Sequence, residues 1–177
     1  MPVNARGRIR DASSRQLPIV RQRSGNDCGP AALATVAFYH GRRIDYDNLC
    51  DVAAVDRQGT DLLALARIAE RLGFRAQGIK ASYDAIPTCT LPAVAHIRRR
   101  VGDGHFVVIH RWTSTHVLLA DPAVGLRKLS RRAFCRRSTG YLLIIQPPRT
   151  PRSRVITKSG ALSTQHVSTP LSFCRRA

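Results

Sequence analysis

The order of the hydrophobic patterns along the chain constrains its fold more than any other feature. Up to about residue 73, apolar side chains recur at helical spacing, and Gly41 and Gly73 follow the two clearest of these stretches as stop signals. From residue 74 onward, the apolar runs are short, rich in β-branched residues and bounded by Gly, Pro, Asp or Ser. Helices followed by strands predict an α+β fold, in which N-terminal helices pack on a C-terminal antiparallel sheet.

The boundaries of the individual elements can also be predicted. A first helix begins at Cys28, with Asp27 as its N-cap and Pro30 in its first turn, where a missing N–H is tolerated. Further helices are expected at 45–54, from residue 60 or 61 to 72, and at 130–137. Strands are expected at 74–79, 93–97, 105–112, 117–120, 126–129 and 141–145.

The length of 177 residues is enough for one domain with its own hydrophobic core and leaves little room for a second. We expect a flexible basic N-terminus over residues 1–17 and the compact domain over residues 18–147. Residues 148–177 are rich in Ser, Thr, Pro and Arg and contain six basic residues and no acid. This composition predicts a basic, disordered tail.

The formal net charge of +18 first suggests an anionic partner, such as nucleic acid or a membrane surface. However, the arginines are spread over the whole chain, which genomic composition alone can produce. No predicted helix carries a clean basic stripe, and no aromatic residues interleave with the arginine clusters as they do in single-strand binders. We therefore expect no nucleic-acid partner.

The cysteines and the N-terminus argue against a metal centre and against a secreted protein. Five cysteines at irregular spacing include no CxxC pair, so neither zinc nor another cofactor is expected. The N-terminus is basic but lacks the apolar core of a secretory signal, and no apolar run approaches the roughly twenty residues of a membrane span. A cytoplasmic chain with free thiols fits these features.

Cys28 has the position expected of a nucleophile. In the sequence GNDCGP it opens a helix, where unpaired backbone N–H groups and the helix dipole favour a thiolate. Gly29 removes bulk beside the sulfur, so that a substrate backbone can approach closely. The alternative is a buried structural cysteine, which is the commoner fate of a lone cysteine.

Two residues in the second half of the chain could serve this nucleophile. His105 opens the β-branched run HFVVIH after the turn sequence GDG, and a histidine at the mouth of a strand can act as a general base. Asp121 ends the strand VLLAD and could hold the imidazole in one tautomer. Each also has an ordinary interpretation, as a structural histidine and as the turn-initiating aspartate of an Asp-Pro pair.

Gln22 is a candidate for stabilising the reaction intermediate. It lies six residues before Cys28 in the sequence. Its side-chain amide, together with the backbone N–H of Cys28, could form an oxyanion hole for a tetrahedral intermediate. A lone glutamine in a basic loop is weak support by itself.

Together these motifs resemble a known family, the papain-like double-glycine leader peptidase domain of bacteriocin-processing and bacteriocin-exporting ABC transporters. The nucleophile motif is QRSGNDCGPAAL, and the segment RQGTDLLALARIAERLGFRAQGIKAS matches the second family signature. The base motif is LPAVAHIRRRVGDGHFVV, and VLLADPAVG supplies the last motif. The resemblance covers residues 18–147 with all four motifs in order.

The resemblance implies a papain-like fold and a cysteine endopeptidase. Cys28 is then the nucleophile and His105 the general base. Asp121 orients the imidazole, and Gln22 contributes to the oxyanion hole. The implied substrate is a precursor whose leader ends in two glycines and is cut after the second. The implied partners are this precursor and the membrane and ATPase parts of an ABC exporter, at the inner face of the cell membrane.

The sequence departs from the family in one respect, since such domains usually continue into membrane spans and an ATPase. Neither a span nor a GxxxxGK[ST] phosphate loop occurs here, so transport and ATP hydrolysis are not carried over to this chain. A standalone peptidase, a subunit of a split exporter and a truncated product all fit this pattern. A non-catalytic module that recruits export substrates is the alternative to an enzyme.

Overall fold

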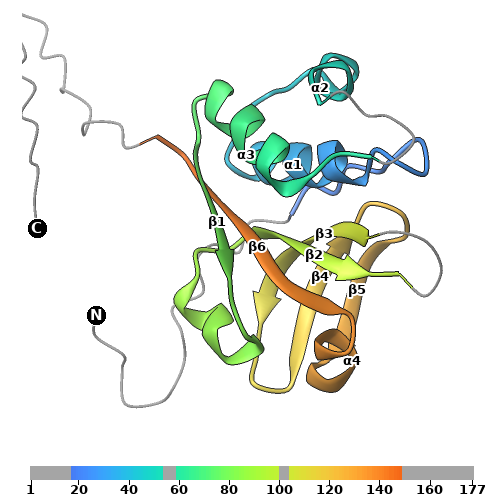
Figure 1. Cartoon of the computed structure of the whole chain (residues 1–177), viewed down its shortest axis with the longest axis vertical. Helices are drawn as coiled ribbons and strands as arrows, with labels where there is room; N and C mark the ends of the chain where they lie inside the picture. Colours follow the sequence, from blue (N-terminus) through green and yellow to red (C-terminus); the bar gives the residue numbers. More distant parts are fainter. Residues whose placement is uncertain (1–16, 54–58, 100–103, 149–177) are drawn as a thin grey trace, which may run out of the picture.

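The computed structural model describes residues 17–53, 59–99 and 104–148. These residues form a helical layer and a sheet layer (Figure 1). The helical layer contains α1 (Cys28–Tyr39), α2 (Tyr46–Val52) and α3 (Leu62–Arg71). No helix in the described ranges is long and apolar enough to cross a membrane. The expected flexible N-terminus and disordered tail lie almost wholly outside these ranges.

The sheet has six strands, all paired antiparallel, in the order β1-β6-β2-β3-β4-β5. The strands are β1 (Arg75–Lys80), β2 (Ala93–Arg98), β3 (Gly104–Trp112), β4 (His116–Asp121), β5 (Gly125–Ser130) and β6 (Ser138–Gln146). The last strand in the sequence therefore lies between the first two. A short helix α4 (Arg131–Cys135) and a 3-10 helix η1 (Tyr83–Thr88) pack on the side of the sheet away from the helical layer (Figure 1).

The predicted α+β architecture is confirmed, with N-terminal helices on a C-terminal antiparallel sheet. Every helix and strand expected from the sequence is present, with boundaries shifted by a few residues. Only η1 has no counterpart among the expected elements. It is a short 3-10 segment that contains Pro87, so it shows neither helical nor strand periodicity.

The alternation of side chains along the strands gives the sheet two apolar faces. Val94 and Val108 pack in the core beneath the helical layer, whereas Ala95 and Val107 pack in the core that η1 and α4 cover. Helix α1 lies on the first face and is buried on almost all sides. Because protein interiors are close-packed, its first residue, Cys28, is held in a fixed position.

Candidate active site

The sulfur of Cys28 lies where the helical layer meets the sheet. Cys28 is the first residue of α1, and only 7% of it is exposed. The groups that lower the pKa of its thiol by hydrogen bonding are the imidazole of His105 and the backbone N–H of Phe106, both at the start of β3. The expected nucleophile and the expected general base, which come from opposite halves of the chain, are therefore in contact.

His105 and Asp121 lie at the same edge of the sheet because β3 and β4 are antiparallel neighbours. The start of one strand therefore adjoins the end of the other. Nε2 of His105 donates to Oδ1 of Asp121 over 2.7 Å, and both residues are buried. This hydrogen bond leaves Nδ1 as the ring nitrogen that can exchange a proton with Cys28, as a relay of thiol, imidazole and carboxylate requires. The guanidinium of Arg99 lies 3.0 Å from the same nitrogen.

Further contacts fix the carboxylate of Asp121. Oδ1 also accepts from the backbone N–H of Ala123 over 3.0 Å, and Oδ2 accepts from Arg127 over 3.5 Å. The carbonyl of Pro122 accepts the backbone N–H of Gln22 over 3.1 Å, which ties the loop before Cys28 to the turn after β4. The Asp-Pro pair therefore begins a turn and also presents its carboxylate to the imidazole.

Asp27 has a different role from the predicted helix cap. It occupies the N-cap position of α1, but its side chain makes no capping hydrogen bond. The carboxylate instead accepts from the backbone N–H groups of Arg23 and Ser24 and from the hydroxyl of Tyr46. The predicted side-chain cap is wrong. The buried carboxylate holds the loop that leads into Cys28 and anchors it to α2.

The structure gives Gly29 a packing role in place of the predicted one. A Cβ at this position would lie 2.4 Å from Cγ2 of Thr60 and 3.3 Å from a methyl group of Leu65. The space beside Gly29 is therefore filled by protein and does not admit substrate. Glycine is required here because α1 and the start of α3 approach closely.

Gln22 lies beside the pair of His105 and Asp121, where all three line a second cavity. Its side-chain nitrogen donates to the carbonyl oxygen of Ser24, and its Oε1 is buried without a hydrogen-bond partner among the described residues. An amide NH₂ group has two hydrogens, so one is left for an oxyanion. The role of Gln22 in an oxyanion hole stays a prediction.

Burial and hydrogen bonding shift the pKa values of Cys28, His105 and Asp121 in opposite directions. Burial disfavours the thiolate, but hydrogen bonds from His105 and from the N–H of Phe106 outweigh it and lower the pKa of Cys28. Burial also disfavours the imidazolium, but the contacts with Asp121 and Cys28 raise the pKa of His105. Burial alone would raise the pKa of Asp121, but its hydrogen bonds lower it. These directions together favour a thiolate–imidazolium pair.

These shifts predict that Cys28 reacts with iodoacetamide at lower pH than Cys50 and Cys89. The thiolate is the reactive form, and its fraction rises as the pH passes the pKa of the thiol. A lowered pKa therefore moves the onset of labelling below that of an ordinary thiol, about pH 8.5. Burial raises the pKa values of Cys50 and Cys89 and moves their onset upward. Mass spectrometry of the labelled peptides follows each cysteine separately, and labelling of Cys28 no earlier than Cys50 would contradict an activated thiolate.

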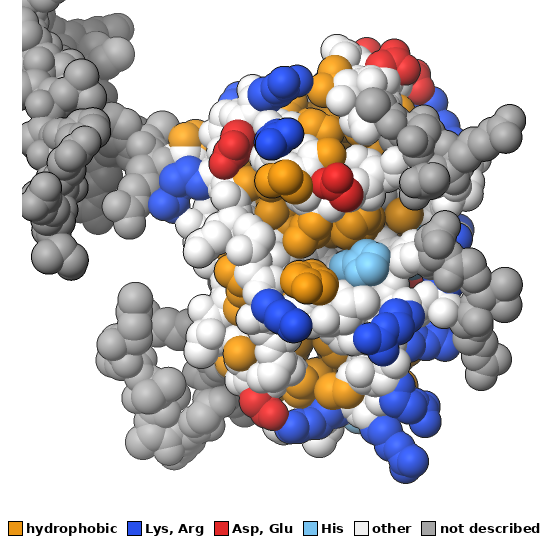
Figure 2. All heavy atoms as spheres, in the orientation of Figure 1, with side chains coloured by type: hydrophobic (Ala, Val, Ile, Leu, Met, Phe, Trp, Pro, Cys, Tyr) orange, Lys and Arg blue, Asp and Glu red, His pale blue; other side chains and the backbone are white. Residues whose placement is uncertain are grey.

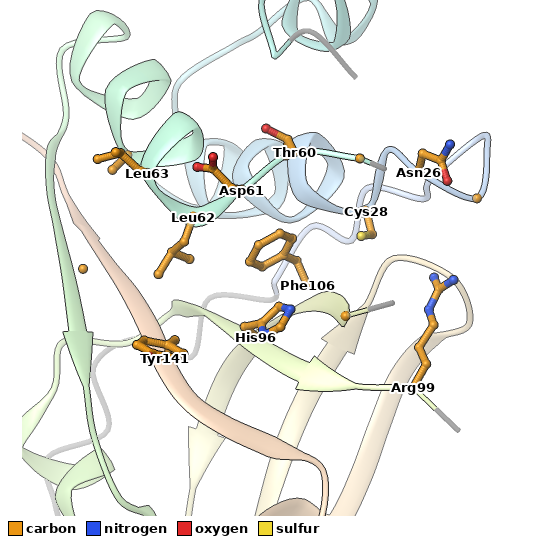
Figure 3. Close-up of a pocket in the computed structure, with 15 residues that line it drawn as sticks. Asn26, Cys28, Thr60, Asp61, Leu62, Leu63, His96, Arg99, Phe106 and Tyr141 are labelled. Carbon is orange, nitrogen blue, oxygen red and sulfur yellow. The ribbon is translucent and has the colours of Figure 1, made fainter. Parts of the chain in front are cut away.

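A cleft of about 720 Å³ opens from Cys28 between the helices and the sheet. Figure 3 shows Cys28 near the end marked by Asn26 and Arg99, Tyr141 near the opposite end, and Phe106 and His96 between them. Apolar side chains line the corresponding hollow on the molecular surface (Figure 2). Within the described ranges, no group of three or more His, Cys, Asp or Glu side chains could hold a metal ion.

His96 and Tyr141 are cleft residues that the sequence analysis did not single out. Nδ1 of His96 is hydrogen-bonded to the hydroxyl of Thr139 over 3.0 Å, and its ring packs against Phe106. Burial lowers the pKa of His96, so the neutral ring is favoured. Tyr141 is 48% exposed. The available signals were a polar residue within an apolar strand for His96 and an aromatic residue at an exposed strand position for Tyr141.

Comparison with known proteins identifies the family. The family model described as the Peptidase C39 family matches residues 16–150, which include Cys28, His105 and Asp121. The chain belongs to the Peptidase C39 family. Members of this family are cysteine peptidases, so the predicted enzyme class is confirmed.

Relatives of the chain include both transporters and small proteins. It is 34% identical over 141 residues to the transport/processing ATP-binding protein ComA of Streptococcus pneumoniae, an alignment that covers 77% of this chain and 20% of ComA. It is 31% identical over 134 residues to the lactococcin-G-processing and transport ATP-binding protein LagD of Lactococcus lactis, with 73% and 19% covered. An uncharacterized protein of Methanothermobacter thermautotrophicus is 34% identical over 131 residues, with 73% and 89% covered. The chain therefore spans about a fifth of the length of the two transporters.

Solved structures support the same assignment. The peptidase domain of Streptococcus ComA matches with a TM-score of 0.70 at 27% identity and covers 75% of this chain and 99% of that domain. A double glycine motif protease from an AMS/PCAT transporter, in complex with the leader peptide, matches with a TM-score of 0.69 at 27% identity, with 75% and 92% covered. The papain-like fold predicted for the C39 peptidase domain is therefore confirmed.

Proposed function

We propose that this protein removes leader peptides from the precursors of secreted peptides by cutting after a double glycine, with Cys28 as the nucleophile. The observation that carries the proposal is the chain of buried contacts from Cys28 through His105 to Asp121 at the end of a cleft. The names of the relatives agree with it. LagD is a processing and transport protein, and one matched protease is solved with a leader peptide.

In the first half of the reaction, the Cys28 thiolate attacks the carbonyl carbon of the second glycine and forms a C–S bond. Negative charge passes to the carbonyl oxygen, which accepts hydrogen bonds from the backbone N–H of Cys28 and from the amide of Gln22. Breaking the C–N bond releases the amine of the mature peptide, which takes the proton from Nδ1 of His105. The leader stays attached as a thioester.

Hydrolysis of the thioester restores the enzyme. Nδ1 of neutral His105 takes a proton from water, and the resulting hydroxide adds to the thioester carbonyl. The C–S bond then breaks, Cys28 leaves as a thiolate, and the leader is released with a C-terminal glycine carboxyl group, which loses its proton to water. Asp121 keeps Nε2 protonated throughout, so Nδ1 is the atom that exchanges protons.

The walls of the cleft suit a leader that ends in glycines. Gly25, Gly59 and Gly104 line the cleft, and a Cβ on Gly104 would lie 1.8 Å from Nε2 of His96. The ring of His96 therefore fills the space beside Gly104, and we expect this wall to leave little room for substrate side chains. Farther along, apolar residues form a wall that fits the apolar face of an amphipathic helix. These residues are Leu62, Leu63, Ala66 and Tyr141.

We also propose that this activity takes place at the inner face of the cell membrane, beside an ABC exporter. ComA and LagD are named as proteins of both transport and processing, and this chain matches about a fifth of each. The transporter would then be either part of the same polypeptide or a separate chain. It would export the peptide that the peptidase releases.

The proposed function predicts cleavage of a synthetic precursor once, directly after its second glycine. A matched precursor with valine in place of that glycine should be cut at least about 100-fold more slowly, because a β-branched side chain does not fit the narrow walls. Mass spectrometry locates the cut, and kcat/KM for the two precursors gives the ratio. If the folded chain binds the glycine precursor and leaves it intact, the non-catalytic recruiting module replaces the peptidase.

A further inference from the structure

A second cavity, of about 530 Å³, adjoins the cleft at Arg99, which lines both. His105 and Asp121 form part of its wall, and four arginines complete most of the remainder. These are Arg98 and Arg99 at the end of β2, Arg127 in β5 and Arg137 before β6. We refer to this hollow as the arginine cavity.

The positive charge of the arginine cavity is only partly neutralised. Asp121 is the one acidic residue of its described lining, and it is engaged with His105 and, at 3.5 Å, with Arg127. Neither Arg98 nor Arg137 forms an ion pair with any residue whose placement is described. The backbone N–H of Arg98 donates to the carbonyl of Arg137 over 2.7 Å, which keeps the two adjacent. Because guanidinium groups stay charged at all accessible pH values, the cavity attracts an anion.

In the proposed reaction, the path of the substrate would bring the mature part of the precursor to this cavity. The cleft on one side of Cys28 takes the leader, so the chain after the cut bond leaves on the other side. His105 gives its proton to the leaving amine, so the first residue of the mature peptide lies against His105. Since His105 also forms a wall of the arginine cavity, the side chains that follow the cut bond lie next to the arginines.

We propose that the arginine cavity binds acidic side chains at the start of the mature peptide, so that the enzyme prefers precursors with Asp or Glu directly after the double glycine. The proposal rests on the proposed function and adds to it a preference on the far side of the cut bond. Arginine suits this task because its planar fork of donors matches the two oxygens of a carboxylate.

Arg99 connects this preference to the reaction. Its guanidinium lies 3.0 Å from Nδ1 of His105, the atom that must carry a proton to the leaving amine. A protonated Nδ1 and a guanidinium both donate, so Arg99 can donate to Nδ1 only while the ring is neutral and has to turn away whenever His105 carries this proton. An acidic side chain in the arginine cavity offers Arg99 a carboxylate as its new partner. Acidic substrates should therefore raise kcat as well as lower KM.

The test compares three precursors with the same leader. One has Glu-Glu directly after the double glycine, one has Gln-Gln there, and one has Gln-Gln there with the two glutamates moved about ten residues downstream. The third has the same charge as the first, so it measures the general attraction of a basic protein for an acidic peptide. We expect kcat/KM for the first to exceed that for the other two by about tenfold, as hydrogen bonds to a charged group allow.

Two charge-matched variants assign the preference to the cavity. Arg98→Gln combined with Arg137→Gln should lower the ratio of Glu-Glu to Gln-Gln cleavage at least about threefold. Arg67→Gln combined with Arg71→Gln, which replaces two exposed residues of α3 that line neither cavity, should leave the ratio unchanged. Circular dichroism confirms that each variant is folded. An equal ratio in the parent chain and in the double variant would overturn the proposal.

Binding measurements distinguish a failure of this proposal from a failure of the proposed function. Fluorescence anisotropy with the Cys28→Ala chain measures the affinity for each intact precursor without turnover. If the parent chain cuts no precursor, the proposed function fails, and tighter binding of Glu-Glu than of both other precursors still supports the arginine cavity. Equal affinity for all three precursors, or for the first and third, would overturn the acidic preference whether or not cleavage occurs.

Discussion

Replacing Cys28 with alanine is expected to reduce cleavage of a double-glycine precursor by about 10⁶-fold, the loss typical of a nucleophile that acts as a unit with its base. The sulfur is the only protein atom that forms a covalent bond to the substrate in the proposed reaction. The substitution removes one buried atom and leaves the backbone of α1 unchanged, so the chain should stay folded. Comparison of kcat/KM with the parent chain measures the loss.

The matched control is Cys135→Ala. Cys135 is an exposed thiol of α4, which covers the opposite face of the sheet, so its loss should leave cleavage near the parental rate. Cys28→Ala should still bind the precursor, because in the proposed function the leader is held by apolar walls away from the sulfur. Cleavage by Cys28→Ala within about tenfold of the parent chain would remove Cys28 from the mechanism.

The elements that carry Cys28, His105 and Asp121 were predictable because they depend on local patterns. The apolar run after Asp27 predicts a helix beginning at Cys28, and the β-branched runs predict the strands that carry His105 and Asp121. Residues at the ends of such elements are natural candidates for chemistry. Whether they meet depends on strand order, and here the family resemblance supplied what spacing alone could not.

The roles of Asp27 and Gly29 could not be predicted, because both depend on contacts between distant segments. An aspartate before a helix usually caps it, yet two loop N–H groups and the hydroxyl of Tyr46 hold this carboxylate instead. Glycine beside a nucleophile suggests access for substrate, yet Thr60 fills the space. In both cases tertiary packing selects one of several roles that the sequence allows.

The clustering of the arginines could not be predicted from the sequence either. Along the sequence they are spread evenly enough to suggest no particular partner. Arg98, Arg127 and Arg137 come from segments around β2, β5 and β6, and only the folded sheet brings them together beside Asp121. Figure 2 shows several Lys and Arg side chains on the sheet layer, below the apolar hollow. A net charge therefore identifies a binding preference only after the fold has placed the charges.

Replacing Asp121 with asparagine is expected to lower kcat/KM by orders of magnitude, up to the roughly 10⁴-fold loss that this substitution causes in a Ser-His-Asp triad, and replacing it with alanine by more. Alanine removes both the acceptor for Nε2–H and the negative charge, so the imidazole can rotate away from Cys28. Asparagine can place its oxygen where Oδ1 now accepts from His105 and Ala123, but it lacks the charge that stabilises the imidazolium. We therefore expect the parent chain to be the most active, Asp121→Asn to be less active, and Asp121→Ala to be the least active.

The pH dependence of Cys28 labelling distinguishes two roles of Asp121, which are to orient the ring of His105 and to stabilise its positive charge. Burial lowers the pKa of His105, and the hydrogen bond to Asp121 is the strongest of the contacts that raise it. Without the carboxylate the pKa of His105 falls, the thiolate loses stabilisation, and labelling of Cys28 should begin at higher pH in both variants. Asp84→Asn, which breaks only an exposed ion pair with Arg131, should change neither the rate nor the onset. An unchanged onset in folded Asp121→Asn would mean that the carboxylate positions the ring and contributes no charge stabilisation.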